Sequence, residues 1–124
     1  MRELTIALQI LIAAGIVNVW ILRFGKSTAF RPDGANNLKE EFSRYGYPDW
    51  VRIGVGTAKL TLAALLVVGI WFPPLAAGAA VAMALLMLVA VVSHVRVGDP
   101  LMKSVPALTM LLLSVSVAWL NGLF

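Results

Sequence analysis

Among the polar side chains inside long apolar stretches of the sequence, five could together bind a ligand. They are Asn18, Lys59, Ser93, His94 and Thr109. A polar group surrounded by apolar chain is costly in free energy, so it is retained where it has a partner or a function. Amide, ammonium, imidazole and hydroxyl groups all form directed hydrogen bonds. We therefore take these five residues as the candidate ligand-binding site.

Several of these residues also have a purely structural interpretation. Asn18 can join two helices by a hydrogen bond, and the long stem of Lys59 can carry its ammonium group outward to Trp50 and the lipid head groups. His94 can be solvated near an interface, although its titration range suits it best of the five to moving protons. It is the only histidine, and the chain has no cysteine. We expect no metal site and find no complete set of catalytic residues.

The composition indicates a protein of the lipid bilayer. Hydrophobic residues make up 60% of the chain and charged residues only 13%, whereas soluble domains carry about a quarter charged residues. The formal charge is +4, with basic residues spread thinly between apolar runs. Such a charge favours anionic lipid head groups over nucleic acid. We expect membrane lipids as partners and no nucleic acid.

Four apolar stretches are long enough to cross a bilayer as α-helices, at 1.5 Å per residue. They cover residues 4–22, 53–72, 75–95 and 105–120, with a hairpin at Pro73-Pro74 and with Pro106 in the first turn of the last helix. The first stretch could instead be a signal peptide, but basic residues follow it rather than precede it. The prediction is an all-α protein, a single domain over 1–124 built as a four-transmembrane-helix bundle.

The basic residues predict how the bundle is oriented. Lys and Arg concentrate in segments 23–52 and 96–104, whereas Arg2 alone lies at the opposite end of the helices. Positively charged loops tend to stay in the cytoplasm. We expect a multi-pass protein of the cytoplasmic membrane with both termini outside. Tryptophans should mark the two interfaces, Trp20 and Trp50 inside, Trp71 and Trp119 outside.

The long segment between the first two helices should contain a short interfacial helix over Leu38–Tyr45. Asn36 or Asn37 can cap it, and Gly46 can end it. Its apolar side would be formed by Leu38, Phe42 and Tyr45, at helical spacing.

The spans should pack through small residues and divide into two unlike halves. The spacings Gly54/Ala58 and Ala76/Ala80/Ala84 suit close helix packing. The five polar candidates all fall in the half nearest the basic loops. The opposite half should be almost purely apolar.

Several short segments together resemble the DoxX-like membrane family. They are Tyr47-Pro48-Asp49-Trp50, residues 54–59, Gly69, Pro74, the alanine-rich third stretch, His94-Val95-Arg96-Val97-Gly98-Asp99 and Pro106. The most telling positions are Tyr47, Pro48, His94, Arg96, Gly98 and Asp99. The resemblance implies a four-helix bundle in a family whose name derives from a subunit of a thiosulfate:quinone oxidoreductase. Many relatives carry Glu near the position of Lys59, so a carboxylate-dependent role does not transfer to this chain.

Three functions follow from these observations. The first is an accessory or assembly subunit of a membrane complex, with other membrane subunits or copies of itself as partners. The second is a quinone- or lipid-binding subunit of an oxidoreductase, in which Lys59 and Asn18 donate hydrogen bonds and His94 passes protons. The third, a small transporter, is disfavoured because proton-coupled export generally needs a membrane-embedded carboxylate and the predicted spans contain none.

Overall fold

The computed structural model describes residues 2–32 and 34–122, and within them the chain is helical without any β-strand. Four helices are long and apolar enough to cross a membrane. The first comprises α1 (Arg2–Val17) and a π-helical turn, η1 (Asn18–Leu22). The others are α3 (Asp49–Val68), α4 (Pro73–Arg96) and α5 (Val105–Leu120), which the 3-10 turn η2 (Leu101–Ser104) precedes. The predicted all-α membrane bundle is confirmed.

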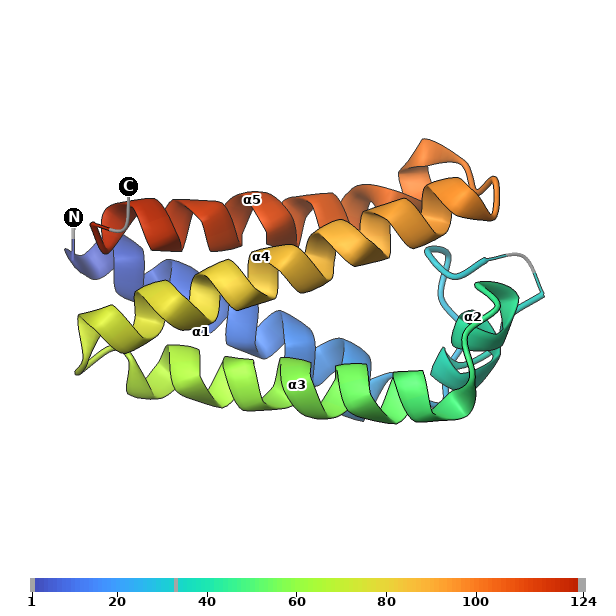
Figure 1. Ribbon diagram of the computed structural model, residues 1–124, viewed down its shortest axis with the longest axis horizontal. Helices are drawn as coiled ribbons and strands as arrows, with labels where there is room; N and C mark the ends of the chain where they lie inside the picture. Colours follow the sequence, from blue (N-terminus) through green and yellow to red (C-terminus); the bar gives the residue numbers. More distant parts are fainter. Residues whose placement is uncertain (1, 33, 123–124) are drawn as a thin grey trace.

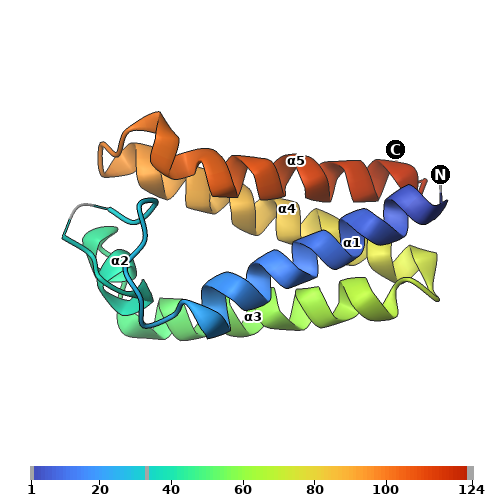
Figure 2. The same cartoon turned by 180° about the vertical axis from the view of Figure 1, so that it is seen from behind.

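At the end that holds α2 (Leu38–Arg44), α1 lies beside α3 and α4 beside α5, and these two pairs stand apart there, whereas toward the termini α1 approaches α5 and α4 approaches α3 (Figures 1 and 2). Both termini and the turn between α3 and α4 lie at the end where the pairs meet. At the other end lie α2 and the connection between α4 and α5. The helix pairs therefore lie furthest apart beside α2.

The boundaries of the second and third spanning helices differ from the predicted ones. The second spanning helix begins at Asp49, four residues before the expected position, because Pro48 is extended and serves as its N-cap. It ends at Val68, and α4 already begins at Pro73. Proline is well placed in a first helical turn, since the amide hydrogen that it lacks has no partner there.

The core of the bundle is formed where the helix pairs meet. Ile12, Leu66, Met83 and Val117 are fully buried there. On α4 the alanines let neighbouring helices approach, with Ala76 and Ala80 at zero exposure. The other expected packing surface is not formed within the chain: Gly54 is exposed, with no atom near the place of a Cβ.

The half of the bundle near the termini is less apolar than expected. Gln9 is 2% exposed, and its Nε2 donates a hydrogen bond of 2.6 Å to the carbonyl oxygen of Leu66. Ser114 is also fully buried, and its hydroxyl is the buried side-chain group without a partner among the described residues. The prediction of an almost purely apolar half was wrong, because Gln and Ser residues that face other helices were not counted among the buried polar groups.

Three of the four tryptophans are exposed, and the fourth is buried. Trp50, Trp71 and Trp119 are exposed on the outside of the bundle. Trp20, expected at an interface, is 8% exposed and lies inside. Its ring fits against Gly56 of α3, where a Cβ would come within 2.7 Å of the ring carbons. The glycine therefore makes room for an indole that the sequence pattern placed at the surface.

Candidate functional site

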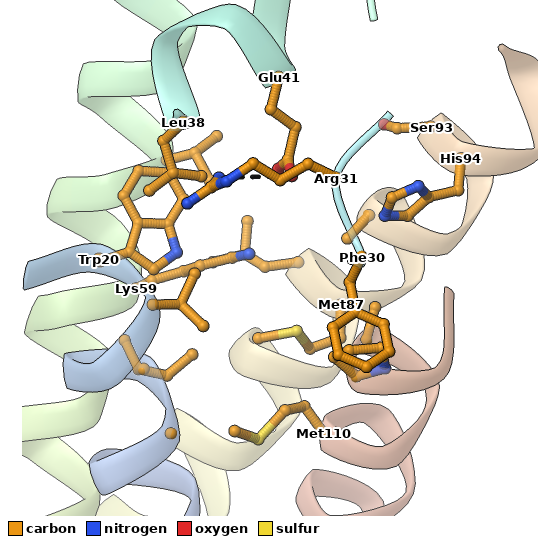
Figure 3. A pocket seen from close by; sticks show the side chains of 18 of the residues that line it. Trp20, Phe30, Arg31, Leu38, Glu41, Lys59, Met87, Ser93, His94 and Met110 are labelled. Atoms are coloured by element: carbon orange, nitrogen blue, oxygen red, sulfur yellow. Dashed lines mark ion pairs between the residues drawn. The ribbon is translucent and has the colours of Figure 1, made fainter. Parts of the chain in front are cut away.

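A cavity of about 940 Å³ lies between the separated helix pairs, beside α2. Its lining is mainly apolar and comes from all five α-helices and from η1. Figure 3 shows Met87 and Met110 at one end and Arg31 with Glu41 at the other. All five polar candidates line this cavity: Asn18, Lys59, Ser93, His94 and Thr109. The structure brings them together from η1, α3, α4 and α5.

Lys59 extends into the interior of this cavity. The residue is only 7% exposed, and its Nζ lies 5.5 Å from the centroid of the Trp20 ring. Among the described residues the ammonium group has this cation–π contact but no hydrogen-bond acceptor. The side chain therefore does not extend outward toward Trp50, which is 73% exposed. Figure 3 shows it crossing the cavity beneath Trp20 and Leu38.

The short helix α2 covers the cavity through its apolar side. Asn37 is its N-cap, and the Asn37 side chain accepts a hydrogen bond from the Glu40 amide. Leu38, Phe42 and Tyr45 are all buried, as their spacing predicted. The helix ends at Arg44, one residue earlier than expected, before Gly46, whose φ of 84° suits glycine. The sequence thus placed this helix and its buried side correctly.

The cavity that contains Lys59 also contains a buried ion pair, which was not predicted from the sequence. Arg31 Nη1 lies 3.5 Å from Glu41 Oε1, with the Arg31 side chain 3% exposed. Arg31 also donates to the carbonyl oxygens of Lys26 and Arg23, at 3.0 and 2.8 Å. The sequence did contain a signal for the burial of Glu41. This residue is at helical spacing from Leu38 and Tyr45, so it lies on the apolar side of α2.

Burial changes the acid strength of Glu41. Loss of hydration raises the pKa of this carboxyl group above its ordinary value, while the positive charge of Arg31 opposes the rise. Lys59 contributes a smaller effect in the same direction as Arg31. The predicted spans contain no carboxyl group, but the cavity does contain one, because α2 supplies Glu41.

The other polar groups tie α2 to the end of α4. We call this the His94 cluster; its members are Tyr45, Tyr47, Ser93, His94, Arg96 and Asp99. Tyr47 Oη lies 2.7 Å from Ser93 Oγ, and Arg96 donates a hydrogen bond of 2.5 Å to the Tyr45 carbonyl oxygen. The Arg96 guanidinium also lies over the Tyr47 ring, 5.1 Å from its centroid. These contacts join segments that lie far apart in the sequence.

His94 is the centre of this cluster and is 6% exposed, so it is not a solvated interfacial residue. Its Nδ1 lies 2.6 Å from Asp99 Oδ2, and its Nε2 lies 3.1 Å from Tyr45 Oη. An ionised carboxylate only accepts hydrogen bonds, so Nδ1 carries the proton and, in a neutral ring, Nε2 accepts from Tyr45. Burial raises the pKa of Tyr45 well above its ordinary value, which keeps this hydroxyl protonated.

The resemblance positions prove to be largely positions of this cluster. Gly98 has a φ of 76°, which lets the chain turn so that the Asp99 amide bonds the His94 carbonyl oxygen at 3.0 Å. Pro48, in an extended conformation, starts α3 directly after Tyr47. The H-x-R-x-G-D segment therefore forms a local fold that holds α2 over the cavity.

Asn18 and Thr109 lie at the edge of the cavity, unlike the three buried candidates. Both residues are exposed to the outside of the chain. Asn18 Oδ1 accepts a long hydrogen bond of 3.3 Å from Arg23 Nε. The five candidates thus divide into an inner set, Lys59, Ser93 and His94, and an outer pair, Asn18 and Thr109.

This arrangement suits binding of a molecule with an apolar body and a polar end. Ligand sites are typically apolar cavities of a few hundred to a thousand cubic ångströms with a few convergent polar groups. Lys59 can donate hydrogen bonds, and Glu41 can accept one where it is ionised. Within residues 2–32 and 34–122 no group of three or more His, Cys, Asp or Glu residues could hold a metal ion.

Comparison with known proteins agrees with the architecture. No curated protein and no solved structure matches the chain. A model of the DoxX-like family, however, matches residues 7–118, which include all four spanning helices in large part, α2 and the His94 cluster. The chain therefore belongs to the DoxX-like family.

Proposed function

We propose that this integral membrane protein is a subunit that binds a lipid-soluble molecule of the quinone class in the cavity beneath α2. The observation that carries the proposal is Lys59, whose buried ammonium group faces the cavity without a hydrogen-bond acceptor among the described residues. A buried charge without a full set of hydrogen bonds is costly, and a ligand carbonyl oxygen would lower that cost.

The cavity walls support an aromatic or quinoid ring in particular. Trp20, Phe42 and Tyr47 offer ring surfaces, and Met87 and Met110 offer polarisable side chains that pack well against rings. A quinone ring carries carbonyl oxygens on opposite sides. One could accept from Lys59 while the other faces the His94 cluster.

The same proposal places the protein as an accessory subunit. The chain contains no cysteine, so it has no thiolate ligands for an iron–sulfur cluster and no redox disulfide of its own. Electrons for a bound quinone would have to come from a partner. We infer that the chain supplies a binding site within a larger membrane complex.

The test is a ligand-dependent melting experiment on the purified protein in detergent, with a decyl-substituted benzoquinone as the probe. We expect the quinone to raise the melting temperature in proportion to its occupancy. Replacing Lys59→Met removes a charged donor worth about 1.5–3 kcal/mol, so the affinity should fall by roughly tenfold to a hundredfold. Lys39→Met removes the same charge at an exposed position outside the cavity and should bind as the native chain does.

The unliganded variant provides a check on folding. Methionine has a similar shape to the lysine stem but no charge, so Lys59→Met should melt no lower than the native protein without quinone. A quinone that fails to stabilise the native chain, or stabilises Lys59→Met equally well, contradicts the proposed site.

A further inference from the structure

The cavity is open on the side where α1 and α5 separate. Figure 2 shows α1 crossing from α5 toward α3, so that η1 ends well away from α5. Lining residues of α1, η1 and α5 on this side are exposed, whereas Lys59, Ser93 and His94 deeper in the cavity are buried. We call this the lateral opening, and its exposed lining residues are Leu11, Ala14, Asn18, Val19, Val105 and Thr109.

The lateral opening lies within the spanning helices and not in a loop. Its residues belong to the spans Arg2–Leu22 and Leu101–Leu120. Four of its six exposed lining residues are apolar, so this side of the cavity faces the hydrocarbon of the bilayer. Toward the termini the opening closes where Met110 packs over Gly15, and toward the other end lie Asn18 and Arg23.

The cavity also reaches the gap between α3 and α4, on the opposite side of the bundle. There the lining residues Val51 and Val55 are half-buried, and Val89 is exposed. This second side therefore offers one exposed residue where the lateral opening offers six. The geometry favours α1 and α5 as the route into the site.

We propose that the ligand enters sideways from the bilayer through the lateral opening and that, once bound, its hydrocarbon tail stays there. The ligand is then a long-tailed amphiphile, with its polar ring at Lys59 and its tail between α1 and α5. This inference rests on the proposed function, since it concerns the same cavity. It adds the tail, the route and the residues that control access.

Trp20 provides an internal reporter for the test because it lines the cavity, whereas the other three tryptophans are exposed. Replacing the three exposed tryptophans by phenylalanine leaves Trp20 as the single tryptophan. These replacements are Trp50→Phe, Trp71→Phe and Trp119→Phe. In this background the protein is reconstituted into vesicles, and quenching of Trp20 by the decyl-substituted benzoquinone is followed over time.

The variants Ala14→Phe and Thr109→Phe place a ring in the lateral opening. If the ring leaves the opening free about one tenth of the time, the rate of quenching falls by about tenfold. Ile10→Phe and Leu112→Phe place the same ring at exposed positions on α1 and α5 outside the cavity and should quench at the native rate. Val89→Phe narrows the opposite side and should also leave the rate unchanged.

The outcomes separate the two proposals. If native Trp20 shows no saturable quenching, or if Lys59→Met quenches equally, the proposed function itself fails. If quenching saturates and depends on Lys59 but neither ring in the lateral opening slows it, the lateral route is wrong and the ligand class stands. If Val89→Phe is the only variant that slows the quenching of Trp20, the ligand enters through the gap between α3 and α4. Ala14 and Thr109 are exposed, so each single variant is an independent test.

Discussion

At the residue scale, the site depends on charges that have been removed from water. Lys59, Arg31 and Glu41 share one cavity, and two of them form an ion pair of 3.5 Å. Such a pair is weak support for stability, because desolvation offsets much of the Coulomb attraction. Its position beside an ammonium group without a hydrogen-bond acceptor favours a role in binding over a role in folding.

The raised pKa of Glu41 makes stability depend on pH in a definite direction. Its ordinary value is 4.5, and burial shifts the folded-state value upward. Below pH 4.5 both the folded and the unfolded chain hold the proton, so the raised pKa makes its full contribution to the free energy of unfolding. As the pH rises through the folded-state pKa, that contribution is lost, at about 1.4 kcal/mol per unit of pKa difference.

Thermal unfolding in detergent over a series of pH values measures this effect. We expect Glu41→Gln to flatten the decline in stability above pH 4.5, because glutamine cannot titrate. Glu40→Gln makes the same replacement at the neighbouring residue outside the cavity and is the matched control. Identical profiles for Glu41→Gln and the native chain would show that Glu41 is not buried as described.

At the element scale, α2 is a short helix whose position depends on contacts with α4. Seven residues are too few for a stable helix in isolation. The Asn37 cap, the buried apolar side and the His94 cluster together supply what the helix itself lacks. Arg96 is central, since it bonds the carbonyl oxygen of Tyr45, the C-cap of α2, and covers the ring of Tyr47.

We predict that Arg96→Leu loosens α2 without unfolding the bundle. Loss of a charged hydrogen bond costs about 1.5–3 kcal/mol, so amide hydrogen exchange in residues 38–44 should accelerate by about tenfold or more. Exchange in α4 near Met83 should stay slow, because that residue lies in the core of the bundle. Arg44→Leu, at an exposed position, is the matched control. Unchanged exchange in Arg96→Leu would mean that α2 is held by its apolar side alone.

At the scale of the whole molecule, an even number of crossings puts both termini on one side of the membrane. The basic residues favour the cytoplasm for the α2 end, which would place the cavity in the cytoplasmic half of the bilayer. A chain without cysteine allows a direct test by single-cysteine labelling.

We expect Ser27→Cys to react with a membrane-impermeant maleimide only after the cytoplasmic side is made accessible. Trp71→Cys, in the exposed turn between α3 and α4, should react in intact cells. Both positions are exposed, so reactivity depends on the side of the membrane. The reverse labelling pattern would invert the orientation and put the cavity in the outer half.

The sequence by itself determined the four crossings, the short helix between the first two of them and the five polar positions. Each of these follows from local information: the length of an apolar stretch, the spacing of Leu38, Phe42 and Tyr45, or a polar residue in an apolar run. Local patterns suffice here because the bilayer requires every crossing of this kind to be an α-helix, so the period and length of each pattern are known in advance.

Only the tertiary structure decided what those elements form together. The burial of Trp20 depends on Gly56 of another helix, and the entry of Glu41 into the cavity depends on how α2 folds back. The cavity exists because, at the α2 end, α1 lies against α3 and α4 against α5, and these two pairs stand apart there. Helix pairing is set by the side-chain fit between segments far apart in the chain, so a single sequence pattern cannot specify it.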